Sequence, residues 1–252
     1  MTIWRLKPWL ECKLDGCWGF LYPPVCQICF DSRATAPEGF VCSACVSQPA
    51  AVRRIWDGFC ARCGLPYEGE MLAPFACENC HGLDLGFEFA RAAVVASPFI
   101  LGLVHRYKYH DGRWLEPRLL SWLVEMAAPQ LRATDWDWLM PVPLHPTRQR
   151  ERGFNQAEQL ACGLAAVTGI PVNTRVLSRV RYTDTQTALN RRNRQVNMAK
   201  AFAAERVEHL QGCRVILVDD VLTTGATTGA CARQLMAAGA SRVGVWTLAR
   251  GS

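Results

Sequence analysis

The stretch VILVDDVLTTGATTGACARQLMAAGA, residues 215–240, decides the fold of this 252-residue chain. Its first four residues, 215–218, are all apolar, as expected for a parallel strand that is buried on both faces. Two carboxylates, Asp219 and Asp220, follow and end the expected strand. Small hydroxylated residues then surround Gly225, and a helix is expected to follow. A strand, a small-residue loop and a helix in this order direct backbone N–H groups and the positive helix end at an anion, so the segment predicts a phosphate site.

The same segment lacks the signatures of the commoner nucleotide loops. It contains neither G-x-x-x-x-G-K-[ST] nor the dinucleotide turn G-x-G-x-x-G. Paired carboxylates directly before a phosphate loop suit a sugar phosphate, because the acids can accept hydrogen bonds from vicinal hydroxyls while the loop holds the phosphate. An acidic strand end that caps a helix and binds no ligand is the alternative. The residues expected to bind the ligand are Asp219, Asp220, Thr223, Thr224, Gly225, Ala226 and Thr227.

Residues 215–227 resemble the 5-phosphoribosyl-1-pyrophosphate (PRPP) signature of type I phosphoribosyltransferases. The order agrees throughout: an apolar run, two acids, two apolar residues, then Thr-Thr-Gly-Ala-Thr. In that family the acids bind the ribose 2- and 3-hydroxyls and the loop binds the 5-phosphate. The resemblance implies PRPP with Mg²⁺ as the ligand, and Asp219 and Asp220 as catalytic residues.

Thirteen cysteines are distributed unevenly, with ten of them between Cys12 and Cys80. Two residues between a pair of thiolates let one tight turn direct both sulfurs at a single ion, and two such turns complete a tetrahedron. The sequence therefore predicts two tandem, structural zinc sites, although an interleaved arrangement, in which the first and third pairs share an ion, stays open. The spacing of Cys12 and Cys17 fits neither site. The predicted ligands form four Cys-x-x-Cys pairs: Cys26/Cys29, Cys42/Cys45, Cys60/Cys63 and Cys77/Cys80.

The net charge of +6 conceals an uneven distribution. Residues 1–90 hold 7 basic and 10 acidic side chains, net −3, whereas residues 91–252 hold 21 and 12, net +9. The first residues contain no apolar block that could act as a signal peptide, and the most lipid-like stretch, residues 92–104, is too short to span a bilayer. We therefore expect a cytoplasmic protein without a membrane span, in which reduced cysteines favour metal binding over disulfides.

A basic segment follows the expected strand Trp138–Val142. Residues 143–152 are expected to form a loop at the carboxyl end of that strand, where open α/β sheets bind ligands, before a helix that opens near Asn155. In type I enzymes the equivalent loop receives pyrophosphate, so its cations are candidates for that role. A solvated basic surface is the alternative. The candidates are Arg148, Arg150, Arg152 and His145.

Two further features are expected to contribute cations. The polar stretch 182–200 lies between two expected strands and has the position of a mobile substrate-covering loop. Its Arg191 and Arg194 would neutralise a leaving pyrophosphate if the loop closes, as catalytic residues, or would follow a nucleic-acid backbone if it does not. Lys108, on an amphipathic run, is either a PRPP contact or a surface lysine.

The whole chain resembles the ComF family of competence-related, phosphoribosyltransferase-like proteins, which includes the GntX-type members. The pieces that carry the resemblance are the double cysteine motif, Lys108-Tyr109 followed by Gly112, the segment PVPLHPTRQRERGFNQAEQLA (residues 141–161), and Thr185-Gln186 with Leu189, Arg194, Asn197 and Phe202. The resemblance implies an α/β fold of the type I phosphoribosyltransferase class: a parallel sheet with helices on both faces, preceded by a small zinc-ribbon domain. The expected divisions are an extension at 1–20, a double zinc ribbon at 21–88 and the phosphoribosyltransferase domain at 89–252.

The pattern of apolar residues agrees with that architecture. Strands are expected near 91–96, 138–142, 175–178, 200–204, 214–218 and 242–248, and helices near 98–109, 113–128, 153–168 and 226–238.

Three hypotheses about function follow. The first is a phosphoribosyltransferase of undetermined acceptor, in DNA uptake or nucleotide metabolism. The second is a non-catalytic module that senses PRPP or a nucleotide and binds single-stranded DNA. The third makes the ribbon a docking platform for a helicase-like competence protein.

Overall fold

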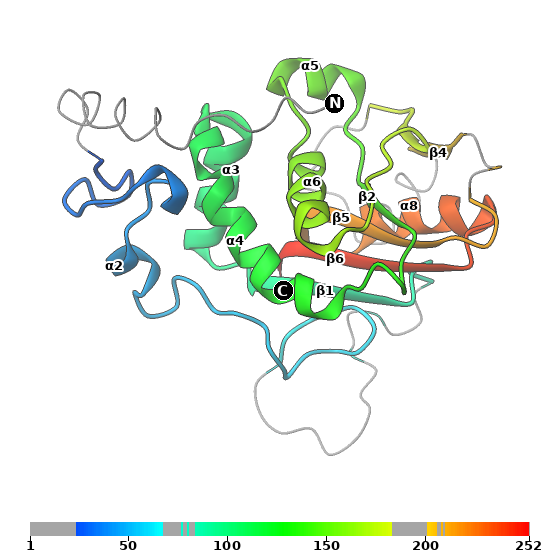
Figure 1. The fold of residues 1–252 in the computed structure, drawn as a ribbon, viewed down its shortest axis with the longest axis horizontal. Coiled ribbons are helices and arrows are strands. Elements are labelled where there is room, and N and C mark those ends of the chain that lie inside the picture. The colour runs from blue at the N-terminus through cyan, green and yellow to red at the C-terminus, as the bar shows by residue number, and fades with distance from the viewer. Residues whose placement is uncertain are drawn as a thin grey trace, which may run out of the picture.

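A four-stranded parallel sheet lies at the centre of the molecule (Figure 1). The computed structural model describes residues 24–67, 77, 80, 84–182, 201–205, 208 and 210–251. The spatial order of the strands is β1-β6-β5-β2, and each neighbouring pair is parallel, as predicted. The strands are β1 (Phe89–Val95), β2 (Trp138–Pro141), β5 (Arg214–Leu222) and β6 (Arg242–Arg250).

Helices cover both faces of this sheet, which confirms the predicted class. Because side chains alternate along a strand, Ile216 and Val218 pack with one set of helices while Val215 and Leu217 pack with another. The first face is covered by α4 (Glu116–Ala127) and α6 (Gln156–Thr168), with α3 (Pro98–Tyr109) beside them, and the second by α8 (Ala226–Ala237). Short helices η2 (Gly112–Leu115) and η3 (Ala128–Gln130) flank α4. Among the helices that the structure describes, none combines the length and apolar composition that a membrane crossing requires.

Two of the expected strands lie outside the central sheet. β3 (Leu177–Arg179) and β4 (Phe202–Ala204) form a separate antiparallel pair, so the expectation that they extend the parallel sheet is wrong. They follow each other along the chain without an expected helix between them, and a parallel pair needs a long crossover. This pair packs against α8.

The segment that contains Cys26, Cys29, Cys42 and Cys45, called the first cysteine segment, packs on helices α3 and α4. It contains η1 (Ala36–Glu38) and α2 (Ser43–Val46). Arg118 of α4 donates to the carbonyl oxygens of Glu38 and Val41, at 2.9 and 3.1 Å, and Arg106 of α3 donates to the carbonyl oxygen of Gln27 at 2.8 Å. Buried cysteines of this segment share one apolar core with the two helices.

The second cysteine segment, residues 53–67 with Cys77 and Cys80, runs beside β1, the outer strand of the sheet. The amide of Ile55 donates to the Ala93 carbonyl at 3.0 Å, and the amide of Ala90 donates to the Arg62 carbonyl at 2.8 Å. Gly64 has a φ of +67°, and a Cβ there would lie 2.6 Å from the carbonyl oxygen of Ala90, so only glycine permits this approach. The backbone groups on the free edge of β1 are thereby paired. The division between ribbon and sheet domain at residues 88 and 89 stays a prediction.

Candidate functional site

The acidic pair lies near the carboxyl end of β5, within the strand. Pairing with β6 continues past Asp219, opposite Thr247, to Leu222, opposite Arg250. The expectation that the two acids end the strand is therefore wrong, because β6 is long enough to keep the ladder intact. Both side chains are buried, with Asp219 8% and Asp220 5% exposed.

The two carboxylates have different surroundings. Asp220 forms an ion pair with the ammonium of Lys108 on α3, while Asp219 lies near Cys231 on α8. Burial, and then the neighbouring charge of Asp220, raise the pKa of Asp219 well above its usual value. Burial acts on Asp220 in the same direction, but the charge and hydrogen bond of Lys108, together with hydrogen bonds from Asp219 and the Val221 backbone, hold the pKa of Asp220 below its usual value. The two adjacent acids are therefore shifted in opposite directions.

The small-residue loop follows the acids as predicted. Gly225 has a φ of +76° and stands immediately before α8, and Ala226 opens the helix. The hydroxyl of Thr224 accepts a hydrogen bond from the Ala226 amide at 3.4 Å, and the hydroxyl of Thr228 donates to the carbonyl of Gly225 at 3.3 Å. Thr223 is exposed and Thr227 is partly exposed, so a ligand can reach the loop. The predicted strand, loop and helix are thus all present.

A cavity of about 220 Å³ adjoins the acidic pair through Lys108. It contains the cations of Arg113, Arg148 and Arg152, with the acids of Asp111 and Glu151. Its wall is completed by Tyr107, Tyr109 and Phe154. Guanidinium groups bind phosphate through paired hydrogen bonds, so the cavity is suited to an anionic group.

The predicted basic loop is in part a helix. Pro146–Arg152 forms α5, whereas the sequence predicted a loop up to Arg152. Proline at the first turn and His145, whose Nδ1 accepts from the Thr147 amide at 3.3 Å, explain the earlier start. The helix turns Arg148 and Arg152 toward the cavity. Arg150 is exposed and does not line it, and Arg191 and Arg194 lie outside the described residues.

Two of the arginines that line the cavity lie against aromatic rings. The Arg152 guanidinium lies 4.8 Å from the ring centroid of Tyr109, and that of Arg148 lies 5.4 Å from Tyr182. Arg152 also donates to Gln156, but its Nε has no partner among the described residues and is buried. These contacts hold planar cations in place beside exposed rings.

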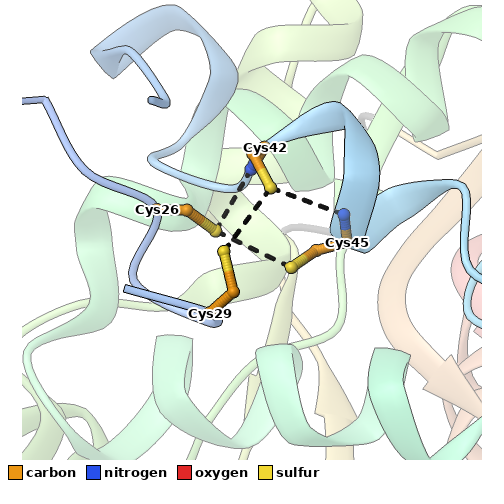
Figure 2. Close-up of side chains that lie close together, drawn as sticks. All are labelled: Cys26, Cys29, Cys42 and Cys45. Carbon is orange, nitrogen blue, oxygen red and sulfur yellow. Dashed lines mark hydrogen bonds between the residues drawn. The ribbon is translucent and has the colours of Figure 1, made fainter. Parts of the chain in front are cut away.

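The first cysteine cluster contains the four sulfurs of the first two pairs (Figure 2). The Sγ atoms of Cys26 and Cys45 are 3.9 Å apart, and those of Cys29 and Cys42 are 3.8 Å apart. Zn–S bonds of 2.3 Å in a tetrahedron require sulfurs about 3.8 Å apart, so the four sulfurs fit zinc. Backbone N–H groups of Ser32 and Asp31 lower the pKa of Cys29 to about 6, which favours the thiolate that a metal needs.

The second cysteine cluster groups the remaining two pairs in the same way. The Sγ atoms of Cys60 and Cys80 are 3.7 Å apart, and those of Cys63 and Cys77 are 3.3 Å apart. Each cluster thus draws on consecutive pairs, and the interleaved arrangement is wrong. These groups suggest two structural zinc sites. All four sulfurs of each cluster face one another, so a bound ion would have no position left for a substrate.

Two functional candidates escaped the sequence analysis. Arg113 follows Gly112, and a Cβ on that glycine would lie 2.6 Å from the Arg106 carbonyl, so the chain turns sharply there and brings Arg113 to the cavity. Arg250 ends strand β6, which is mostly apolar between Val243 and Ala249, and is 1% exposed. A charged residue closing a buried strand is the signal that could have identified it.

Comparison with known proteins gives two groups of similar chains. "DNA utilization protein YhgH" of Salmonella typhi is 32% identical over 90% of this chain and 97% of its own, and "Competence protein F" of Haemophilus influenzae is 30% identical over 89% and 96%. Among solved structures, the glutamine PRPP amidotransferase of B. subtilis has a TM-score of 0.34 at 27% identity, covering 50% of this chain and 25% of its own. A purine phosphoribosyltransferase of Pyrococcus horikoshii also has a TM-score of 0.34, at 16% identity, covering 52% and 83%. No protein-family model matches the chain.

The similarity to the curated relatives extends over both parts of the chain, the cysteine segments and the α/β sheet. It includes nearly the full length of the relatives themselves. The chain therefore belongs to the ComF family of phosphoribosyltransferase-like proteins.

Proposed function

We propose that this protein binds Mg²⁺-PRPP at the carboxyl end of β5. The observation that carries the proposal is a buried pair of carboxylates, Asp219 and Asp220, placed directly before a small-residue loop and the start of α8. Burying two adjacent carboxylates is costly, and Lys108 offsets part of that cost through its ion pair with Asp220 Oδ2. A ribose with two vicinal hydroxyls would supply further donors to the two acids.

Each end of the ligand has a matching part of the site. The loop residues Thr223 to Thr227 would bind the 5-phosphate through amides and hydroxyls. The cavity that holds Arg113, Arg148 and Arg152 would receive the pyrophosphate, and Lys108 both lines this cavity and pairs with Asp220. Mg²⁺ would neutralise charge on the pyrophosphate when bound.

The reaction that this arrangement favours is phosphoribosyl transfer. The bond between ribose C1 and the pyrophosphate oxygen breaks, pyrophosphate leaves with the electron pair, and a nucleophilic acceptor forms the new bond to C1. Arginines in the cavity would stabilise the charge that develops on the departing oxygen. Arg191 and Arg194 remain predicted contributors to that charge. Because the relatives are named for DNA utilization and competence, we place the activity in DNA uptake.

Binding is tested by titrating the full chain with Mg²⁺-PRPP in a calorimeter. We expect saturable binding by the wild type, and a loss of tenfold or more, roughly one hydrogen bond to a charged group, in Asp219→Asn/Asp220→Asn. Asp135→Asn, an exposed acid before the amino end of β2 and so at the opposite edge of the sheet from the loop, is the control. Pyrophosphate release across a panel of nucleobases and amines then tests transfer. Equal binding by the wild type and the double variant would contradict the proposal.

A second candidate function is single-stranded DNA binding next to the same cavity. Tyr109 is 51% exposed and Tyr182 is 43% exposed, and each has an arginine on its ring. Exposed rings beside cations are typical of surfaces on which successive bases stack. A helicase-like partner that docks on the cysteine segments stays a hypothesis.

The two functions are separable by variants. Tyr109→Ala/Tyr182→Ala should weaken binding of a labelled oligonucleotide, and Tyr182→Ala alone, outside the lining of the cavity, should do so while PRPP binding changes little. Asp219→Asn/Asp220→Asn should weaken PRPP binding and leave oligonucleotide binding intact. Phosphate contacts by arginine predict that affinity for the oligonucleotide falls steeply with added salt. An oligonucleotide affinity that is independent of salt and of both tyrosines would exclude this surface.

A further inference from the structure

The guanidinium of Arg250 lies between the second cysteine cluster and the small-residue loop Thr223 to Thr227, which is called the phosphate loop below after its proposed ligand. Arg250 is the last residue of β6, and its side chain is among the largest that are fully buried. We propose that Arg250 is a positioning residue that couples the metal state of the second cysteine cluster to the shape of the phosphate loop. This proposal rests on the proposed function only in taking Mg²⁺-PRPP as the ligand. The coupling between metal in the second cluster and the conformation of the loop does not require a ligand.

On one side Arg250 holds the start of the phosphate loop. Its Nη1 donates to the carbonyl oxygens of Leu222, at 3.1 Å, and Thr223, at 2.7 Å, and also to that of Gly251. Leu222 is the last residue of β5, and Thr223 is the first residue of the loop. Arg250 therefore holds the point at which the chain leaves the strand, together with the Gly251 amide, which donates to the Leu222 carbonyl at 2.8 Å.

On the other side Arg250 contacts a residue of the second cysteine cluster. Its Nε donates to the carbonyl oxygen of Cys63 at 3.0 Å, and its Nη2 lies 3.8 Å from the Cys63 sulfur. Donors to ligand sulfurs are a usual way in which a protein orients a metal site and adjusts its charge. The first cysteine cluster packs on α3 and α4, and no hydrogen bond between described residues joins its cysteines to the loop.

The contacts of Arg250 with Cys63 make the link dependent on metal. Zinc held by Cys63 would fix the position of that residue's carbonyl oxygen and sulfur, the two groups that Arg250 contacts on this side. Loss of the metal would free Cys63 to move, and with it the contacts that hold Arg250 between Cys63 and Thr223.

The coupling must act in both directions. If zinc in the second cluster favours the loop conformation that binds phosphate, then a ligand on the loop must favour retention of that zinc by the same factor. Typical coupling factors between two sites are about 5- to 150-fold. The first cluster should show no such coupling, which makes it an internal control.

Hydrogen exchange tests the coupling without any ligand. Cys80→Ser removes one ligand from the second cluster and Cys29→Ser one from the first, and neither residue contacts Arg250. We expect Cys80→Ser to speed exchange of the amides at residues 224–228 by about tenfold, while those of the central strand at 215–218 stay protected. Equal effects of the two variants on the loop would overturn the proposal. If Cys80→Ser fails to fold, the same exchange is followed in the wild-type protein during release of its zinc to a chelator.

Zinc release with and without ligand identifies Arg250 as the link. In Cys29→Ser, which retains the second cluster, saturating Mg²⁺-PRPP should slow release of zinc to a chromogenic chelator about tenfold. Arg250→Met should abolish that protection and Arg250→Lys should restore part of it, since lysine keeps the charge. Arg242→Met, at the other end of β6 and paired with Glu88, is the matched control and should behave as the parent.

The outcomes separate the two proposals. If PRPP does not bind the wild type but loss of second-cluster zinc still loosens residues 224–228, the coupling stands and the proposed function fails. If PRPP binds and its affinity is the same with and without zinc in the second cluster, the coupling is overturned and the proposed function stands. Absence of zinc from the second cluster of the purified protein would also overturn the coupling.

Discussion

At the scale of single residues, the site depends on the balance of charges around Asp219 and Asp220. Two adjacent carboxylates in a strand would both be ionised in water. Here burial and the charge of Asp220 raise the pKa of Asp219, whereas the ion pair with Lys108 helps to hold the pKa of Asp220 below its usual value. The sheet supplies the asymmetry, because successive residues of β5 face opposite sides and only Asp220 faces α3.

Removing the cation should destabilise the protein in a pH-dependent way. Lys108→Met leaves Asp220 buried without its partner, and we expect a loss of about 3 to 5 kcal/mol in the free energy of unfolding at pH 7. Because the pKa of Asp220 is lowered in the folded protein, the stabilisation is present above the unfolded pKa and is lost as pH falls through the folded pKa. Urea denaturation should therefore show a smaller loss at acidic pH. Lys108→Met/Asp220→Asn should recover most of the free energy of unfolding that Lys108→Met loses at pH 7. A Lys108→Met variant as stable as the wild type at pH 7 would refute the ion pair.

Replacing Asp219, the acid whose pKa is raised, should instead stabilise the protein. A carboxyl with a raised pKa in the folded state opposes folding above that pKa and costs nothing below the unfolded pKa. Asp219→Asn should raise the melting temperature at pH 8, by ~2–4 °C for each kcal/mol recovered, and less at pH 5, while PRPP binding is lost. Asp137→Asn is the control of opposite sign, because Arg214 lowers the pKa of Asp137 and the variant should melt earlier. A lower melting temperature of Asp219→Asn at pH 8 would contradict the assignment.

At the scale of elements, α5 decides which basic side chains can act on a ligand. A helix spaces its side chains by about 100°, so three arginines at alternate positions cannot all face one cavity. Arg148 and Arg152, four residues apart, share the cavity side, and Arg150 is exposed. The sequence places all three in one loop, where each is an equal candidate.

This spacing predicts unequal effects of three single substitutions. Arg148→Ala and Arg152→Ala should each weaken the binding of Mg²⁺-pyrophosphate, by roughly ten- to a hundredfold for a charge-assisted contact, because both line the cavity. Arg150→Ala removes the same charge from the same helix and should change affinity little. Calorimetric titration measures all three. Equal losses in the three variants would point to long-range attraction by net charge in place of specific contacts.

At the scale of the whole molecule, the cysteine segments and the α/β sheet form common cores. Cysteines of the first cluster are buried with residues of α3 and α4, and those of the second cluster with residues of β5, β6 and α8. The segment with the second cluster also pairs with the edge of β1. Both faces and one edge of the sheet thus depend on residues before 67 or on Cys77 and Cys80.

A fragment that begins at residue 89 should therefore not fold as the full chain does. It would expose apolar surface on α3 and α4, free the edge of β1, and leave Arg250 buried without Cys63. We expect aggregation, or loss of cooperative thermal unfolding and of near-ultraviolet circular dichroism. The full chain purified in parallel is the control. A monomeric fragment with the full chain's melting temperature would show that the cysteine segments are an independent addition.

Much of the fold was predictable because the relevant signals are local. The apolar run 215–218, the acids and the Thr-Thr-Gly-Ala loop lie in one continuous stretch, so their order alone predicts the strand, the loop and the helix. The helices near 98–109 and 226–238 were predicted almost to the residue from their periodicity. The antiparallel pairing of β3 with β4 was missed, because strand direction is a property of two segments and neither sequence contains it.

The sequence by itself determined which chemical groups this protein carries: eight cysteines at metal-ligand spacing, two acids before a small-residue loop, and an excess of arginine in the second part. These depend on residue type and on spacings of a few residues. Only the tertiary structure decided which groups meet: consecutive cysteine pairs in each cluster, Lys108 on Asp220, Arg113 at the cavity, and Arg250 between Cys63 and Thr223. The physical reason is that burial, charge pairing and hydrogen bonding act between segments up to 187 positions apart, and packing of the sheet brings them together.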